Sequence, residues 1–530
     1  MSIRSIKPIN YIFGLLFAFS IVAGYQCEFF GRLIPGSWKT YFFFVLVFVV
    51  ATLFSYVFWD MIKERADREI SNDDKTTNPG KIWAGSSVVI WICNFIVFLG
   101  VYPGFFVYDA FEELNETITR SFNDQHPIFH VLSMGAVIQA MHKLTGDYNI
   151  SVAVFILLQM SFNAIILGYV VRELYVEAKN KKLCIGALIY FALFPVLMMC
   201  NLCSAKDCVF TGLLVLLTIY LRRMFLESDF DKSSKNLIKL GLLSTFMMLY
   251  RSNGVYAFIV FAVLVLLLRK VSKRTLTVMI VSVIAYFVIN TGLLGITNAQ
   301  RVGHREILTV PIMQLSRVYA YDNESMTGEE KAKLESYIPR ENLLSYTPKC
   351  SDLVKIGFDE KAFEGDKAGF YKLWLSTGIK HPVAYMDALC MTGYGMWYPN
   401  ATIDGYKGRE VFTFTYGDSS YFGYETEPPA ERHSFIPAID RFFRYLSIEG
   451  GTRAIPIVHF LFSPGFMLWV LLFIIGYFVY TQNVSKALSY ALPLTVILTC
   501  FIGPMSLVRY AFCLWIIVPF GFTDMFIKEE

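Results

Sequence analysis

Charged residues are scarce in this sequence. Asp, Glu, Lys and Arg make up only 17% of the 530 residues, whereas hydrophobic residues make up 55% and Phe alone occurs 48 times. A soluble chain of this length would need charged surfaces on each of its domains, so the composition excludes an ordinary soluble protein. Apolar runs of about 20 residues between short charged loops are typical of a polytopic membrane protein.

Several other features are also missing. The net charge is only +4, and no block of basic residues suggests binding to nucleic acid. The 10 Cys lie mostly inside apolar runs, so no disulfide framework can be recognised. The apolar N-terminal stretch reaches Phe30 without a small-x-small cleavage site, and we interpret it as a retained first helix. We find no internal repeat and no low-complexity tract.

The apolar runs predict an all-α polytopic membrane protein with about twelve spanning helices. The predicted spans are 11–30, 40–60, 83–101, 149–171, 183–203, 207–222, 237–250, 252–269, 275–295, 455–480, 486–504 and 507–526. A further apolar stretch, 127–142, is short for the hydrocarbon core at about 1.5 Å per residue. We predict that it lies along the outer membrane interface, or enters the membrane and returns.

The distribution of basic residues gives the predicted orientation. If 127–142 does not cross, Lys and Arg gather on one side, in the loops 63–81, 172–182, 222–239 and 269–274. This is the positive-inside pattern of cytoplasmic loops. It predicts a multi-pass cell-membrane protein with both termini in the cytoplasm. A crossing at 127–142 would place the later clusters outside.

This topology divides the chain into four parts. They are an N-terminal pair of helices with a cytoplasmic loop (1–82), a core with an acidic external loop at 102–126 (83–295), an external soluble segment of mixed or helical structure (296–454) and the C-terminal helices (455–530). The external segment contains an amphipathic stretch whose apolar residues could pack on the membrane or on a core: Phe370, Leu373, Leu375, Ile379 and Tyr385.

Acidic residues gather in the stretch FVYDAFEELNETITRSFNDQHPIFH, which directly follows a predicted span. Apolar residues at helical spacing predict a helix over 110–122, with Asp109 at its N-cap and Glu112 and Glu113 in its first turn. Asp109 has two readings, as a simple helix cap or as a functional carboxylate. His126 likewise has two, as a satisfied interfacial histidine or as a ligand group.

Three other short connections at the ends of predicted spans carry charged residues without a polar loop around them. They are Lys206-Asp207, Arg251-Ser252-Asn253-Gly254 and Arg509-Tyr510. A charge at a membrane boundary is costly unless it is paired or used, although each one alone could snorkel or cap a helix. The topology puts all three hinges and the acidic loop on the external face, which favours one shared site.

The chemistry of these groups suggests their roles. Carboxylates can act as a general base or hold a divalent cation, so Asp109 and Asp207 are the catalytic candidates. Basic groups at membrane depth suit a lipid-borne phosphate. We therefore predict a lipid-phosphate site made by His126, Lys206, Arg251 and Arg509, with support from Glu113, Asp124, Asn253 and Tyr510. No cofactor is certain, and a divalent cation remains an open alternative.

Together, the order of these motifs resembles the GT-C superfamily of membrane glycosyltransferases. The matching features are VYPGFFVYDAFEEL after a span, the short helix opened by NDQHP, the AKD hinge, and the YRSNG and VRY hinges. More closely, they look like a bacterial GT-C-like family of uncharacterised function. The resemblance implies a polyprenyl-phosphate sugar as donor and catalysis at the outer membrane face. It also implies that Asp109 activates the acceptor or supports a metal, with Asp207 as a second acid. The double-acid signature of metal-dependent relatives is absent at Tyr108-Asp109-Ala110.

The sequence thus leads us to expect a glycosyltransferase that modifies an envelope glycan, lipid or protein from a polyprenyl-phosphate-linked sugar, in contact with membrane lipids. One alternative is a transporter or flippase of a lipid-linked saccharide. It would place ionisable groups near the bilayer midplane, often within internal repeats. The other alternative is a non-catalytic scaffold for envelope assembly, which would tolerate changes at Asp109 and Asp207.

Overall fold

The computed structural model describes residues 6–34, 36–66, 78–301, 303–403, 426–447, 452 and 457–527. Across these ranges the regular elements are all helices, accompanied only by isolated β-bridges. Six of the helices are long and apolar enough to cross a membrane: α1 (Pro8–Phe30), α2 (Trp38–Ala66), α3 (Pro79–Gly100), α6 (Tyr148–Ala178), α9 (Asp207–Leu226) and α12 (Lys273–Ile296). The chain is an all-α, multi-pass membrane protein.

The other predicted spans are shorter or broken. Segment 183–203 forms α7 (Lys181–Leu193) and α8 (Pro195–Asn201), which meet at a bend of 55°. Pro195 begins α8, and proline disfavours the helical conformation in the residue before it, which explains the break at this point. The remaining predicted spans contain the helices α10 (Ser234–Tyr250), α11 (Ser252–Leu267), α22 (Pro464–Tyr480), α23 (Val484–Ser489), α24 (Ala491–Thr499) and α25 (Leu514–Asp524).

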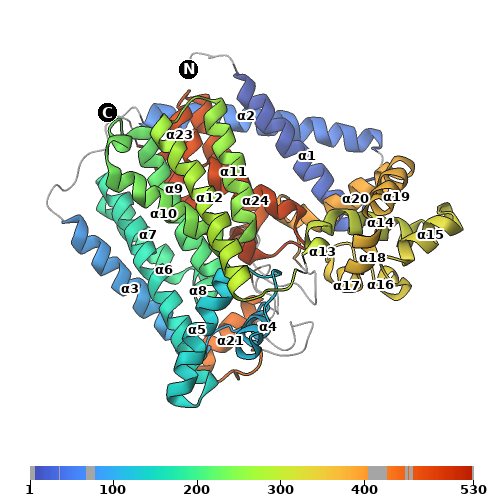
Figure 1. Cartoon of the computed structure of the whole chain (residues 1–530). Coiled ribbons are helices and arrows are strands. Elements are labelled where there is room, and N and C mark those ends of the chain that lie inside the picture. The colour runs from blue at the N-terminus through green and yellow to red at the C-terminus, as the bar shows by residue number, and fades with distance from the viewer. Residues whose placement is uncertain are drawn as a thin grey trace.

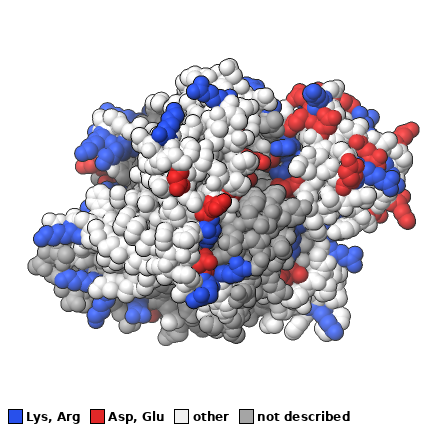
Figure 2. Space-filling model, turned by 90° about the horizontal axis from the view of Figure 1, so that it is seen from below, with Lys and Arg blue, Asp and Glu red and all other residues white. Residues whose placement is uncertain are grey.

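The stretch predicted at 127–142 is helix α5 (Ile128–Thr145), and it is not among the six long apolar helices. It packs between α4 (Ala110–Thr119) and α6. In Figure 1 the two chain ends lie at one end of the bundle, and α4 and α5 lie at the other. Figure 2 shows that the surface of the helix bundle is largely uncharged. Acidic and basic side chains gather on the right, where Figure 1 places the helices of residues 304–393.

The N-terminal pair of helices is docked on the C-terminal part of the chain. Phe13 of α1 makes edge-on ring contacts with Trp469 of α22 and Trp59 of α2, each with ring centroids 5.6 Å apart. Lys7 donates a hydrogen bond of 2.6 Å to the carbonyl of Tyr480. The first and last parts of the sequence are therefore one packed body.

Segment 296–454, which the sequence predicts to be external, begins with a separate helical unit that has its own core and that we call the external unit after this prediction. Its helices are α13 (His304–Ile307), α14 (Thr309–Tyr321), α15 (Gly328–Glu335), α16 (Arg340–Leu344), α17 (Asp352–Lys355), α18 (Glu360–Gly365), α19 (Lys367–Lys380) and α20 (Pro382–Gly393). Phe370, Leu373 and Tyr385 pack in that core, whereas Leu375 and Ile379 are 57% and 83% exposed. The amphipathic stretch therefore divides between a core and an exposed face.

The end of the external segment returns to the bundle. The backbone N–H groups of His433 and Phe435 donate to the carbonyls of Tyr102 and Leu99. Helix α21 (Pro437–Ser447) then packs against α3, where Ile439 lies so close to Gly100 that a Cβ there would meet it at 2.6 Å. This return brings residues from 426 onward beside the acidic loop.

We expect a large loss of stability when Asp524 is replaced by Ala. Asp524 is 2% exposed and accepts hydrogen bonds from Arg222 (2.8 and 3.0 Å), Lys486 (3.3 Å) and Tyr490 (2.9 Å). Removing one partner of a buried ion pair leaves uncompensated charge and typically costs about 3–5 kcal/mol. Thermal unfolding of the purified protein should show the loss. Asp229→Ala, which removes an exposed acid paired only with Lys232, should leave the melting temperature unchanged, and equal melting of the two variants would refute this role.

Candidate functional site

The charged hinges meet in one cavity of about 340 Å³. The predicted residues that line it are Asp109, His126, Lys206, Arg251, Asn253, Arg509 and Tyr510. They come from the loop around α4, the start of α9, the α10–α11 hinge and the short 3-10 helix Val508–Ala511. Helix starts place several of these side chains: Lys206 directly precedes α9, Arg251 links α10 to α11, and Asn253 lies in the first turn of α11.

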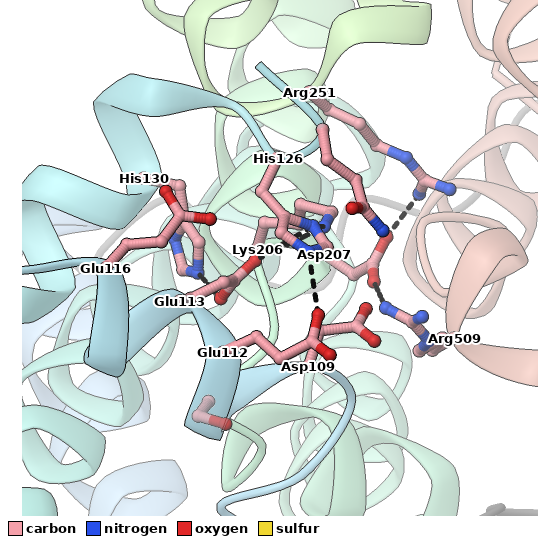
Figure 3. Close-up of polar contacts among 12 residues, drawn as sticks. Asp109, Glu112, Glu113, Glu116, His126, His130, Lys206, Asp207, Arg251 and Arg509 are labelled. Carbon is pink, nitrogen blue, oxygen red and sulfur yellow. Dashed lines mark hydrogen bonds and ion pairs between the residues drawn. The ribbon is translucent and has the colours of Figure 1, made fainter. Parts of the chain in front are cut away.

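Asp207 holds two of these basic residues together. It lies 3% exposed at the start of α9, and its carboxylate pairs with Arg251 through one oxygen and with Arg509 through the other, at 2.7 Å. Figure 3 shows the two guanidinium groups approaching Asp207 from different sides. Tyr108 lies 4.1 Å from Arg509, and Tyr510 lies 4.7 and 4.8 Å from Arg509 and Arg251, measured from ring centroid to guanidinium carbon. These rings fix both cations through cation–π contacts.

Glu113 forms a second buried ionic cluster. The side chain accepts from His130 Nε2 at 3.2 Å and from Lys206 Nζ at 3.4 Å, and it lies 3.5 Å from His126 Nδ1. Burial alone would raise the pKa of Glu113, but His130 and Lys206 outweigh it and hold the pKa below its usual range. Glu113 therefore stays ionised and anchors Lys206 at the edge of the cavity. Asp124, the other predicted supporting acid, does not line the cavity, and its backbone N–H donates to the carbonyl of Gln300.

The reading of Asp109 as a side-chain helix cap is wrong. Asp109 precedes α4, as predicted, but its backbone is left-handed (φ 73°, ψ 8°) and its side chain makes no capping hydrogen bond. Tyr108 is left-handed too, with φ 63°. Non-glycine residues in this region cost about 1–3 kcal/mol and occur preferentially at functional sites. The helix also ends at Thr119, earlier than predicted, because Arg120 turns left-handed.

Glu427 caps α4 instead, although no local pattern around Glu427 predicts this contact. Its carboxylate accepts from the backbone N–H of Asp109 at 3.2 Å and of Phe111 at 2.7 Å. The side chain is 4% exposed, and burial, together with the charges of Asp109 and Glu113, raises the pKa of Glu427 to about 8. In the sequence Glu427 is one more acidic residue in a turn-rich stretch.

The raised pKa of Glu427 predicts a pH-dependent stability. The pKa in the folded protein lies above the ordinary value of 4.5, so the favourable contribution is complete below about pH 4.5 and is lost as pH rises through about 8. We expect the melting temperature to fall by a few degrees between about pH 5 and pH 8 and to level off above pH 8. Glu427→Gln cannot ionise, so it should start from a lower melting temperature and lack this fall. An equal fall in the variant would exclude Glu427 as its source.

Asp109, Glu112 and His126 could together hold a divalent cation. One ligand atom from each lies within 4.8 Å of the others. His126 Nε2 is buried, has no hydrogen-bond partner and lies 4.0 Å from Glu112. However, Lys206 Nζ lies 3.1 Å from His126 Nδ1, and an ammonium can only donate, so the imidazole proton is on Nε2. This geometry favours a protonated His126 Nε2 that faces Asp109 and Glu112. Binding of a metal would require Lys206 to move away from Nδ1.

The external unit completes the cavity wall, which the sequence did not predict. Glu306, Asp352 and Lys355 line the cavity together with the hinge residues. Lys355 is 4% exposed and pairs with Glu306 at 2.7 Å and with Asp352 at 3.5 Å. These residues are far in sequence from the hinges and resemble ordinary surface charges of a soluble segment.

Comparison with known proteins places the chain in a family. Residues 29–530 match the model of a family of unknown function, DUF6020. The chain belongs to this family. No curated protein and no solved structure matches it. The family match covers α2 and the external unit, whereas nearly all of α1 (Pro8–Phe30) precedes its first residue.

The site therefore combines two kinds of chemistry. Arg251, Arg509 and Lys206 provide fixed positive charge, and Asp109 provides a partly exposed carboxylate in the same cavity. Arg509 Nε is buried and has no hydrogen-bond partner among the residues that the structure describes, and a buried donor of this kind requires an acceptor. Such an arrangement can bind an anion and accept a proton from a neutral group next to it.

Proposed function

We propose that this protein is a GT-C-like membrane glycosyltransferase. It moves a sugar from a polyprenyl-phosphate donor to an envelope glycan, lipid or protein at the external membrane face. The observation that carries the proposal is the single cavity lined by Asp109, Lys206, Arg251 and Arg509. A carboxylate beside a cluster of cations at helix ends suits transfer from a lipid-linked phosphate.

The basic side of the cavity binds the donor phosphate. Arg251 and Arg509 are held by Asp207 and by the rings of Tyr108 and Tyr510, so their positions are fixed before the ligand arrives. Arg509 Nε supplies a free buried donor. Preorganised cations of this kind stabilise the charge that develops on a leaving phosphate. Asp207, predicted to assist catalysis, acts in this scheme as a positioning residue.

Asp109 serves the acceptor. The acceptor hydroxyl attacks the anomeric carbon, the bond from that carbon to the phosphate oxygen breaks, and its electron pair leaves with the polyprenyl phosphate. Asp109 takes the hydroxyl proton, which makes a poor nucleophile reactive at neutral pH. His126, with its Nε2 proton facing the acids, fixes the carboxylates during this step.

The test is donor turnover in detergent. Purified protein should release polyprenyl phosphate from a polyprenyl-phosphate sugar when an acceptor is present, and the sugar should appear on the acceptor. A transporter or flippase would leave the donor intact, because translocation without compartments changes no covalent bond. A donor that stays intact with every envelope acceptor tried would contradict the proposal.

The proposed topology has about twelve crossings, with both termini cytoplasmic and the cavity external. It predicts that single cysteines at Ile118, Arg340 and Glu431 react with an impermeant thiol reagent on intact cells. Cysteines at Lys182 and Lys235 should not react, although all five positions are exposed. The background should lack Cys93 and Cys184, the half-buried native cysteines. External labelling at Lys182 would mean that α5 crosses the membrane.

A further inference from the structure

A second polar cavity lies where α1 meets the external unit. Its volume is about 560 Å³, and it is lined by the end of α1, by α14 and by the start of α20. None of its lining residues belongs to the cavity described above. Figure 1 shows the end of α1 beside α20 and α14.

The end of α1 indicates where this cavity lies relative to the membrane. That helix is 23 residues long and apolar enough to cross the membrane, so its end at Phe30 marks a membrane boundary. Exposed aromatic residues surround this level, with Phe29 60%, Phe30 53% and Trp38 73% exposed. Aromatic residues gather where the hydrocarbon core meets the headgroups. The cavity therefore opens at the level of lipid headgroups.

The floor of the cavity is a buried ion pair. Arg317 is 5% exposed, and its Nη2 donates to Asp387 at 3.1 Å and to the carbonyl of Gly31 at 3.1 Å. Asp387 also accepts from the backbone N–H of Leu33 at 2.7 Å. The pair thus joins the turn after α1 to the external unit and gives the cavity a rigid floor.

One cation at the cavity has no ion-pair partner among the described residues. Asp387 is balanced by Arg317, Asp322 lies 2.9 Å from His381, and Lys380 is paired with Glu330 just outside the lining. Arg32 is exposed at the mouth, directly after the end of α1, and makes no ion pair with the described residues. Arg32 can therefore pair with a negatively charged group of a ligand, such as a phosphodiester.

The rim of the cavity is apolar. Phe30 and Val383 line it and are 53% and 59% exposed, and Ile379, near the end of the preceding helix α19, is 83% exposed. Exposed apolar side chains next to a charged cavity fit an amphiphile better than a water-soluble anion. We propose that this cavity binds the phosphodiester headgroup of an anionic membrane lipid, with Arg32 as the cation that contacts it. The bound lipid ties the external unit to the membrane surface, independently of the transfer reaction.

The test is a titration of the full-length protein, purified in phosphatidylcholine-containing detergent, with phosphatidylglycerol, with bound lipid counted by native mass spectrometry. A hydrogen bond to a charged group typically corresponds to a change of about 10-fold or more in affinity, so Arg32→Ala should weaken phosphatidylglycerol binding by that factor. Arg32→Lys should retain part of it. The control is Arg340→Ala, which removes an exposed arginine of the external unit that lines neither cavity. This variant should bind phosphatidylglycerol like the unchanged protein.

Two further measurements distinguish a lipid phosphate from a water-soluble phosphate as the ligand. Glycerol phosphate at millimolar concentration should fail to displace the lipid, because it lacks the chains that meet the apolar rim. If it binds with the same dependence on Arg32, the ligand is a water-soluble phosphate and the lipid assignment is wrong. If phosphatidylglycerol and phosphatidylcholine bind equally to the Arg32→Ala and unchanged proteins, the site does not exist. These outcomes concern lipid binding alone and leave the transfer assay unaffected.

Discussion

Asp109→Asn should reduce sugar transfer by about 10²–10⁴-fold, the usual contribution of a positioned general base. The substitution keeps the size of the side chain, and asparagine tolerates the left-handed backbone found at this position. Folding should be preserved because the carboxylate of Glu427, not that of Asp109, caps α4. The loss should appear in kcat with donor binding unchanged, since the donor phosphate contacts the arginines. Steady-state kinetics with a purified donor and acceptor measure both quantities.

The matched control is Asp229→Asn, which removes an exposed acid on the loop after α9 and should leave transfer unchanged. Melting temperature should be the same for both variants and the unchanged protein. If Asp109→Asn retains nearly full transfer, the base lies elsewhere. Asp352 and Glu306 would then be the next carboxylates to test, because they line the same cavity.

Arg509→Gln should reduce kcat by about 10²–10³-fold, as removal of a preorganised donor to a developing charge typically does. Arg509 is held by Asp207 at 2.7 Å and faces Tyr108 and Tyr510, so its loss removes both a phosphate contact and a partner of a buried acid. The matched comparison is Arg509→Lys, which keeps a positive charge beside Asp207 but lacks the planar guanidinium fork. We expect the Lys variant to fold like the unchanged protein and still to turn over donor slowly.

Asp207 gives a further check on this prediction. If Asp207 only positions the two arginines, Asp207→Asn combined with Arg509→Gln should cost much less than the two separate losses multiplied together. Multiplicative losses would mean that Asp207 has a separate role in the reaction. A folded Arg509→Lys protein with unchanged turnover would show that Arg509 does not contact the phosphate.

The hinge residues could be predicted from sequence because of a simple energetic rule. Charges such as Lys206, Asp207, Arg251 and Arg509 at the ends of apolar helices are costly unless they are paired or used. Since they had no loop in which to be solvated, they had to meet one another or a ligand. In the structure, Asp207 pairs with Arg251 and Arg509. The long apolar helices could also be predicted from the sequence, because a membrane-spanning helix needs about 20 apolar residues wherever it occurs.

Other parts of the site lacked such a signal. Glu427 is 318 residues away from Asp109 in the chain, and an acid in a turn usually faces water. Lys355 and Glu306 likewise belong to a soluble unit, where a charged residue needs no explanation. The local helix rule also misled at Asp109, because the left-handed backbone there turns its carboxylate away from the cap. Contacts between distant segments and special backbone conformations are set by tertiary packing, which no local pattern records.

The most direct measurement is a structure of the protein with bound polyprenyl phosphate. Our account predicts that the phosphate lies against Arg251 and Arg509, within reach of Lys206, in the same cavity as Asp109. The lipid chain should leave this cavity toward the membrane. A phosphate bound elsewhere, with both arginines still paired only with Asp207, would contradict the account.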